Sequence, residues 1–188
     1  MRIILASESA ARKHGMDVLG VPYEVMPASL DEKAIRDPDP HAMAQKLAVA
    51  KAKAISEKER DAIVIAADLF VVHDEKIIEK PLDVAEAKRM LRTLSGATHE
   101  MVSGLAVYDP KKKKMHATSI TCKVTFRTLT DHEIDDYVTN HHVTRYAAGF
   151  EHDGLLRFAT HIEGGYIFRT GMPIDHLILF LRECGVKV

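Results

Sequence analysis

Residues 62–72 read Ala-Ile-Val-Ile-Ala-Ala-Asp-Leu-Phe-Val-Val, and this run decides the fold. A short apolar run of this kind is typical of a strand buried on both faces. The polar stretch 73–76 and the returning pair Ile77-Ile78 then predict a hairpin. An unpaired carboxylate in a buried strand is costly, so Asp68, which interrupts the run, is expected either to be paired or to lie at a strand bend facing a cleft.

Helices and strands are mixed on both sides of this run. Asp39-Pro40 and Asp83 begin two helices, and Thr130 with Glu133 forms a capping box at a third. The expected helices cover 10–19, 39–54, 83–94, 130–138 and 173–184, and the other strands cover 2–6, 23–26, 98–108 and 115–127. A glycine-rich section, 149–171, is expected to consist mainly of loops. This pattern predicts an α/β fold with a mixed sheet.

Composition excludes several classes of protein. The 188 residues are 46% hydrophobic and 28% charged, so a folded core is expected, and they can form one domain or two lobes that share a cleft. The net charge of −1 argues against a nucleic-acid binder. No membrane span or signal peptide is expected, and two cysteines suit a reducing compartment, so we expect a cytoplasmic protein.

The first candidate site is formed by Ser7, Ser9 and Arg12, which lie between a strand and the start of a helix. Backbone N–H groups and the helix dipole attract anions at such a place, and an arginine can bind a phosphate with two donors. In the alternative interpretation, Ser9 only caps the helix and Arg12 is a solvated surface residue. No glycine-rich phosphate motif is present.

A second group combines one acid with two lysines, Glu32, Lys51 and Lys80. Each alone would usually be surface charge. Together with Asp68 they are consistent with a phosphate site, because carboxylates hold Mg²⁺ and lysines neutralise phosphate oxygens.

Several stretches of the sequence are similar to the signatures of one known family. Residues 5–12, Leu-Ala-Ser-Glu-Ser-Ala-Ala-Arg, are similar to that family's opening signature, Leu-Ala-Ser-x-Ser-Pro-Arg-Arg. Further matches, in order, are Asp31-Glu32, Leu47 to Ala52, Ala67-Asp68, Lys80 to His99, Phe126 to Tyr137, and Ile162 to Pro173. Along nearly its whole length the sequence therefore resembles the Maf family.

The resemblance implies hydrolysis of nucleoside triphosphates, usually non-standard or pyrimidine nucleotides, to monophosphate and pyrophosphate with a divalent metal, Mg²⁺ or Mn²⁺. It implies one domain over 1–188, with an elongated mixed sheet, flanking helices and two lobes around a cleft, as in inosine-triphosphate pyrophosphatases. Family members often form homodimers, and the family is linked to inhibition of septum formation. By position, Asp68 would be the general base or a metal ligand and Glu32 would assist with the metal. Ser7, Ser9, Arg12, Lys51 and Lys80 would hold the phosphates.

Two departures from the family pattern bear on substrate choice. Ala10-Ala11 replaces Pro-Arg of the signature, which removes one cationic contact. The segment 147–154 carries Phe150 and Asp153 where one branch has tyrosine and glutamine. That branch resembles thymidine/uridine triphosphatases, whereas a branch with phenylalanine and a carboxylate looks like the one that favours 7-methylguanosine triphosphate. A carboxylate can accept hydrogen bonds from the guanine edge, so Asp153 is a candidate base-reading residue.

Two alternatives remain open at this point. One is an inosine/xanthosine triphosphate pyrophosphatase on the same fold, which differs only in substrate preference. The other is a nucleotide-binding regulator of cell division without strong turnover, which would need binding but not the acid at position 68.

Overall fold

The computed structural model describes all residues, 1–188, and divides into two compact units. Unit 1 comprises Met1–Leu69, Val102–Ile120 and Gly165–Val188, and unit 2 comprises Phe70–Met101 and Thr121–Gly164. The single two-lobed domain with a cleft remains a prediction.

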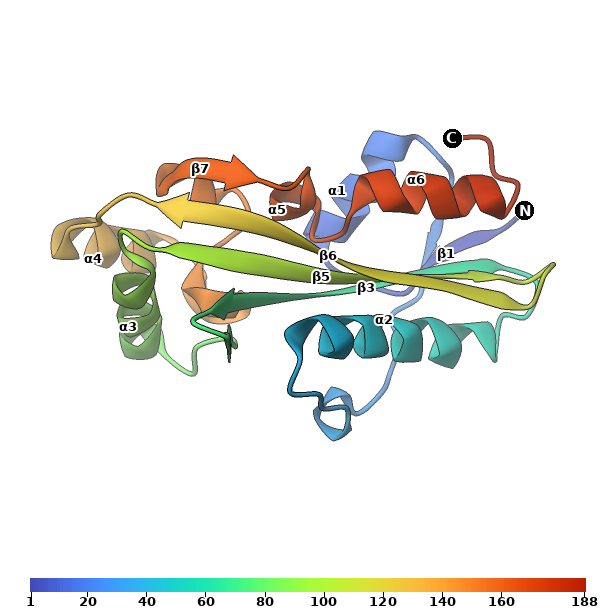
Figure 1. The fold of residues 1–188 in the computed structure, drawn as a ribbon, viewed down its shortest axis with the longest axis horizontal. Coiled ribbons are helices and arrows are strands. Elements are labelled where there is room, and N and C mark those ends of the chain that lie inside the picture. Colours follow the sequence, from blue (N-terminus) through green and yellow to red (C-terminus); the bar gives the residue numbers. More distant parts are fainter. The chain divides into compact units, whose positions relative to one another are not determined.

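The chain forms an α/β fold around a mixed seven-stranded sheet, which confirms the predicted class (Figure 1). The strand order is β2-β1-β3-β5-β6-β7, with β4 paired to β3. β1 pairs in parallel with β2 and β3, whereas β4 and β7 pair antiparallel with β3 and β6. The strands are β1 (Ile3–Leu5), β2 (Glu24–Val25), β3 (Ile63–His73), β4 (Lys76–Ile78), β5 (Thr98–Asp109), β6 (Lys114–Phe126) and β7 (Ala159–Glu163).

The helices begin close to the predicted caps. They are α1 (Ala10–Leu19), α2 (Pro40–Ser56), α3 (Val84–Leu94), α4 (Asp131–Asn140), α5 (Ile167–Thr170) and α6 (Ile174–Glu183), with 3₁₀ turns η1 (Glu32–Ala34), η2 (Val143–Arg145), η3 (Ala147–Gly149) and η4 (Gly154–Arg157). Asp39 and Asp83 cap α2 and α3 through their side chains, and Thr130 with Glu133 forms a full capping box on α4. These caps satisfy backbone N–H groups that the first helical turn leaves open. None of the helices is both long and apolar enough to cross a membrane.

Helices cover both faces of the sheet in unit 1, with α2 on one side and α1 and α6 on the other (Figure 1). Alternate residues of one strand serve opposite faces. In β3, Ile63 and Ile65 join the core beneath α1 and α6, whereas Val64 and Ala66 join the core beneath α2. Both faces are therefore dry, which explains why β3 reads as a continuous apolar run.

Gly104 allows α2 to lie against β5. A Cβ atom at Gly104 would lie 2.1 Å from the carbonyl oxygen of Ala44, which is backbone and cannot move aside. Small residues continue this close approach along the helix, because Ala48 and Ala52 are fully buried against the same face. The position of α2, and of every side chain it carries toward the sheet, depends on this contact.

Unit 2 has an aromatic core. His99 and Phe126 make an edge-to-face contact with ring centroids 4.6 Å apart, and Phe150 and Phe158 each lie 5.5 Å from Phe126. The imidazole of His99 is 1% exposed, and neither ring nitrogen has a hydrogen-bond partner. Burial, with a smaller contribution from His73, lowers the pKa of His99 to about 4, so the ring is neutral at pH 7.

Three details differ from the sequence-based expectations. β3 runs without a break through Asp68, because that residue is paired. β2 has only the two residues Glu24 and Val25, both exposed. β7 lies in the section expected to be loops; most of its side chains are exposed, so it carries no apolar alternation that could have indicated a strand.

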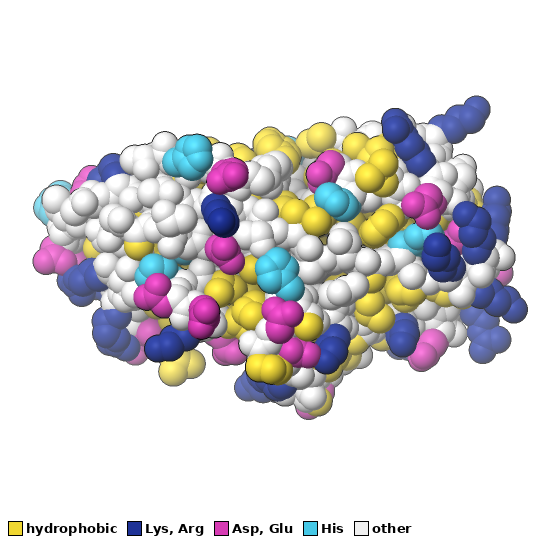
Figure 2. All heavy atoms as spheres, viewed as in Figure 1, with side chains coloured by type: hydrophobic (Ala, Val, Ile, Leu, Met, Phe, Trp, Pro, Cys, Tyr) yellow, Lys and Arg dark blue, Asp and Glu magenta, His cyan; other side chains and the backbone are white.

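A cluster of lysines occupies the β5–β6 turn, as expected for a solvated hairpin tip. Lys111, Lys112, Lys113 and Lys114 are all exposed. Figure 2 shows Lys and Arg side chains gathered where Figure 1 places this turn.

Candidate active site

The core of the candidate site is a buried ion pair between helix α2 and strand β3 of unit 1. Asp68 follows Ala66 by two residues, so strand alternation directs it to the α2 face, and Lys51 lies on the buried side of α2 beside Ala48 and Ala52. Lys51 Nζ donates to Asp68 Oδ1 at 2.6 Å. Both residues are only 7% exposed. The predicted pairing of Asp68 is thus found, with a partner 17 residues away in the chain.

Glu32 supplies a second carboxylate to the same lysine. It begins the η1 turn, whose N-cap Asp31 accepts a hydrogen bond from the Lys33 backbone N–H. Glu32 Oε1 lies 3.2 Å from Lys51 Nζ, and its side chain is 52% exposed. The lysine therefore bridges one buried and one accessible carboxylate.

Arg12 adds a second buried cation. Its Nη1 donates to Ser7 Oγ at 3.0 Å, and its Nη2 lies 3.9 Å from Asp68 Oδ1. The side chain is 14% exposed, and its buried Nε has no hydrogen-bond partner. Burial lowers the pKa of Arg12, while the charges of Asp68 and Glu32 act in the opposite direction. The alternative interpretation of Arg12 as a solvated surface residue is therefore wrong.

Ser7 and Ser9 lie at the N-terminal end of α1. Ser7 is 7% exposed and accepts both from Arg12 and from the Ser9 backbone N–H, at 3.2 Å. Ser9 occupies the N-cap position of α1, but its side chain makes no capping bond. The hydroxyl group is thus not used for the simple capping role that was the alternative interpretation. The positive end of the α1 dipole adds to the attraction for an anion here.

The charges in this cluster balance. Two cations, Arg12 and Lys51, face two carboxylates, Asp68 and Glu32, within a largely buried region. A triphosphate entering it brings unmatched negative charge, which a divalent cation can compensate. The two carboxylates are hard oxygen donors of the kind that Mg²⁺ and Mn²⁺ prefer, and Lys51 already holds a positive charge between them. The residues present fit the predicted divalent metal.

Two further predicted residues, Lys80 and Asp153, belong to unit 2. Lys80 is exposed and follows Glu79, whose carbonyl oxygen accepts from the Ala148 N–H at 3.0 Å. Asp153 is exposed at the N-cap of η4, without a side-chain cap bond. Its neighbour Gly154 passes so close to Tyr137 that a Cβ would lie 2.0 Å from the hydroxyl oxygen.

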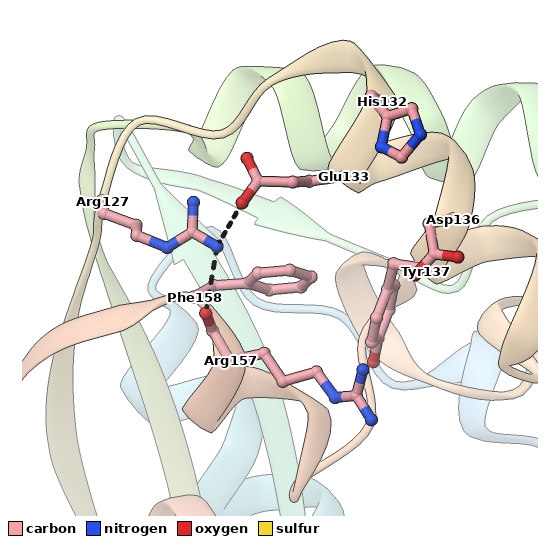
Figure 3. A pocket seen from close by; sticks show the side chains of 7 residues that line it. All are labelled: Arg127, His132, Glu133, Asp136, Tyr137, Arg157 and Phe158. Carbon is pink, nitrogen blue, oxygen red and sulfur yellow. Dashed lines mark hydrogen bonds and ion pairs between the residues drawn. The ribbon is translucent and has the colours of Figure 1, made fainter.

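Unit 2 also contains a pocket of about 290 Å³ that the sequence did not indicate (Figure 3). Its lining residues are Arg127, His132, Glu133, Asp136, Tyr137, Arg157 and Phe158. Arg127 pairs with Glu133 at 2.7 Å and also donates to the Arg157 carbonyl oxygen. The Tyr137 hydroxyl oxygen accepts from the Glu151 N–H, so one wall of this pocket supports the segment that carries Asp153.

Comparison with known proteins finds similarity along nearly the whole chain. The family model described as Maf-like protein matches residues 2–184. The chain is 36% identical over 189 residues to a protein named dTTP/UTP pyrophosphatase from Bacillus cereus (strain AH820), covering 100% of this chain and 97% of the relative. It is 36% identical over 184 residues to a dTTP/UTP pyrophosphatase of Citrifermentans bemidjiense, covering 97% and 95%.

Among solved structures, a HAM1 protein from Coxiella burnetii matches with a TM-score of 0.54 at 14% identity, covering 97% of this chain and 99% of that one. At this identity the likeness shows a shared fold. The match to the Maf-like model and the sequence similarity to the two relatives extend over nearly every residue. The chain therefore belongs to the Maf family.

Proposed function

We propose that this protein is a nucleoside triphosphate pyrophosphatase that hydrolyses the bond between the α and β phosphates with the help of a divalent metal. The observation that carries the proposal is the buried cluster of Arg12, Lys51 and Asp68 at the N-terminal end of α1. A buried arginine with an unsatisfied Nε–H is costly to maintain unless a ligand uses that donor. The names of the relatives support the same reaction.

The reaction needs a base, an oriented water and positive charge on the leaving group. Asp68 takes a proton from water while the water oxygen bonds to the α phosphorus. The bond from that phosphorus to the bridging oxygen breaks, and its electrons leave with pyrophosphate. A bound Mg²⁺ or Mn²⁺, held by Asp68 and Glu32, would supply further positive charge at the phosphates.

The remaining residues have binding roles. Lys51 and Arg12 stabilise charge on the phosphate oxygens in a region of low dielectric, where such contacts are strong. The Ser7 oxygen accepts from Arg12, so its own hydrogen is free to point toward a phosphate oxygen, and Ser9 supplies a second hydroxyl. Lys80 is proposed as a third cationic contact to the triphosphate.

The base preference is proposed to be 7-methylguanosine triphosphate, through Asp153. A carboxylate accepts from the N1–H and N2–H₂ groups of guanine, which pyrimidines lack. Phe150 is buried against His99 and Phe126, so of the two distinctive residues only Asp153 is exposed for base contact. We also propose a cytoplasmic homodimer; both cysteines are free thiols, which suits a reducing compartment.

The reaction is tested with dTTP, UTP, CTP, ITP and 7-methyl-GTP in Mg²⁺ or Mn²⁺, with phosphate measured before and after addition of inorganic pyrophosphatase. Phosphate that appears only after this addition identifies pyrophosphate as the product. In ¹⁸O-water, label in the monophosphate locates attack at the α phosphorus. Binding without release of any product would instead support the regulator.

Asp68→Asn tests the base. We expect kcat to fall by a factor of about 10³ or more, because a general base contributes about 10² to 10⁴ and a metal ligand is weakened as well. Circular dichroism should show the native fold, since asparagine keeps the shape and can accept from Lys51. A folded variant with full turnover would exclude the assigned role.

Asp153→Gln tests the base preference separately. The ratio of kcat/KM for 7-methyl-GTP to that for dTTP should fall at least tenfold, since glutamine offers one acceptor where the carboxylate offers two. Asp74→Asn, at an exposed turn of the same unit, is the matched control and should leave the ratio unchanged. An unchanged ratio in Asp153→Gln would remove the guanine assignment without touching the hydrolase assignment.

A further inference from the structure

Unit 1 contains a second cluster of ligating side chains that shares no residue with the candidate active site. Asp109 ends β5, His116 lies in β6, and Cys184 follows the last residue of α6. One donor atom from each lies within 4.8 Å of the other two. All three residues are buried, at 1%, 6% and 3% exposure. A carboxylate, an imidazole and a thiol from three different parts of the chain therefore lie close together in a buried region.

His116, a member of this cluster, carries an unsatisfied polar atom. Its Nδ1 lies 3.2 Å from Glu183 Oε2, whereas its Nε2 is buried without a hydrogen-bond partner. A buried polar atom without a partner costs about 1 to 3 kcal/mol. A carboxylate at one nitrogen of a histidine favours the tautomer in which the other nitrogen has a free lone pair, as in carboxylate–histidine–metal arrangements. Nε2 is thus ready to accept a ligand.

The other two residues are held in place by the surrounding backbone. Asp109 Oδ1 accepts from the N–H groups of Lys111 and Lys112, which fixes the carboxylate at the hairpin turn. The Cys184 thiol hydrogen bonds to Asp109, and burial raises its pKa to about 11. Lys112 Nζ lies 3.8 Å from Asp109 Oδ2, but this side chain is 56% exposed and can turn toward solvent.

We propose that Asp109, His116 and Cys184 bind one divalent cation of the zinc class, with water in the fourth position. A thiolate, an imidazole and a carboxylate together suit Zn²⁺ or Co²⁺, in contrast to the all-oxygen pair Asp68 and Glu32. Because the three atoms are no more than 4.8 Å apart, some point lies within about 2.8 Å of all of them (4.8 Å divided by √3), so ligation at about 2.0 to 2.3 Å needs shifts of at most about 0.5 to 0.8 Å. The cation replaces the thiol proton, which is released to solvent.

The bound cation would tie the β5–β6 hairpin to the C-terminal end of α6. These segments already meet, because Lys112 Nζ donates to the Glu183 carbonyl oxygen at 2.6 Å. A metal that binds only the folded protein raises the melting temperature, and the rise continues with the logarithm of the free metal concentration once that concentration exceeds Kd. The site is therefore structural, and its occupancy does not require nucleotide.

The test uses Co²⁺ as a spectroscopic probe on the full chain, kept reduced and first stripped with a chelator. A thiolate ligand gives a near-ultraviolet charge-transfer band that the carboxylates Asp68 and Glu32 cannot produce. We expect this band at one equivalent of Co²⁺, its loss on addition of Zn²⁺, and a Zn²⁺-dependent rise in melting temperature. The titration is repeated after refolding in the presence of metal, so that slow entry into a buried site is not mistaken for lack of binding.

Variants decide which thiol and which histidine are involved. Cys184→Ser should abolish the band, and His116→Gln should weaken Zn²⁺ binding at least tenfold. Cys122→Ser, which removes the other buried free thiol, should leave both unchanged. Absence of the band in the wild-type protein, or its survival in Cys184→Ser, would overturn the proposal. In that case the cluster is a hydrogen-bonded contact between thiol and carboxylate, whose loss in Cys184→Ser lowers stability without any response to Zn²⁺.

Discussion

The two units differ in whether the polar side chains that they bury carry a charge. Unit 1 buries full charges, with Arg12 and Lys51 against Asp68, and leaves the Arg12 Nε without a partner. Unit 2 buries a neutral imidazole, His99, among aromatic rings and keeps its ion pairs, such as Arg127 with Glu133, near the surface. Because buried charges are expensive and apolar replacements are often as stable, the arrangement in unit 1 is better explained by ligand binding than by stability.

The largest effect is expected from breaking the buried pair. Lys51→Met leaves Asp68 buried beside only the more distant Arg12, and it should destabilise the protein by about 3 to 5 kcal/mol and abolish turnover. Urea unfolding and pyrophosphate release measure the two effects. The double variant Lys51→Met/Asp68→Leu should recover part of the stability, since Arg12 still loses its buried carboxylate, and none of the activity. If the double variant were as unstable as the single one, the charges would be needed for folding rather than for function.

A smaller effect is expected when α2 is displaced without changing a charge. Gly104→Ala places a Cβ against the Ala44 backbone, so α2 and Lys51 must shift, at a cost of about 1 to 3 kcal/mol and with loss of activity. Gly15→Ala in α1 is the comparison, because its Cβ would lie 2.8 and 2.9 Å from the ends of the flexible Met172 and Ile174 side chains, which can move aside where the Ala44 backbone cannot, and alanine favours a helix. Equal losses of activity in both variants would contradict a special role for the α2 contact.

Unit 2 should respond to pH through His99. Its pKa is about 4 in the folded protein against 6.5 for an unperturbed histidine, so the unfolded chain binds a proton at pH 5 that the folded chain does not. Stability should therefore fall as pH drops below 6.5, by about 1 to 2 kcal/mol between pH 7 and pH 5. His99→Phe should flatten this part of the curve in urea unfolding at each pH. An unchanged slope would show that other groups cause the acid sensitivity.

The smallest effect is expected at the surface pair of unit 2. The hydrogen bond from Arg127, with two from Thr130, lowers the pKa of Glu133 to about 2. Glu133→Gln removes the charge but can keep the capping box at α4, since glutamine serves the same position. The melting temperature should be unchanged within error. A large drop would mean that exposed and buried pairs are not as different as proposed.

Local signals predicted most of the fold. Asp39, Asp83 and Thr130 act as caps where the sequence placed them, because capping is decided by a few neighbouring residues. β7 could not be predicted from the sequence, because most of its side chains are exposed and only its pairing with β6 makes it a strand. Pairing between strands that are distant along the chain leaves no pattern in the local amino-acid sequence.

The residues of the buried cluster in unit 1 were named from the sequence, but their arrangement could not be. The resemblance marked Glu32, Lys51 and Asp68, and strand alternation explains why Asp68 faces α2. The burial of Arg12 and the bridging position of Lys51 between two carboxylates depend on contacts between distant segments. The cluster of Asp109, His116 and Cys184 could not be predicted for the same reason: its members are far apart in the chain and form no spaced motif.

The division of unit 1 into three chain segments has a consequence for synthesis. Its core includes Leu177, Leu181 and Cys184, so the sheet that carries Asp68 cannot be fully covered until these residues have left the ribosome. Residues of unit 2, by contrast, have all been made by Gly164. Translation adds roughly 5 to 20 residues per second. Many seconds therefore pass between the synthesis of Arg12 and Lys51 and the synthesis of the residues that complete the core of unit 1. A nascent chain would therefore have no hydrolase activity until α6 is available. A chain that is cut short before α6 should be inactive rather than partly active.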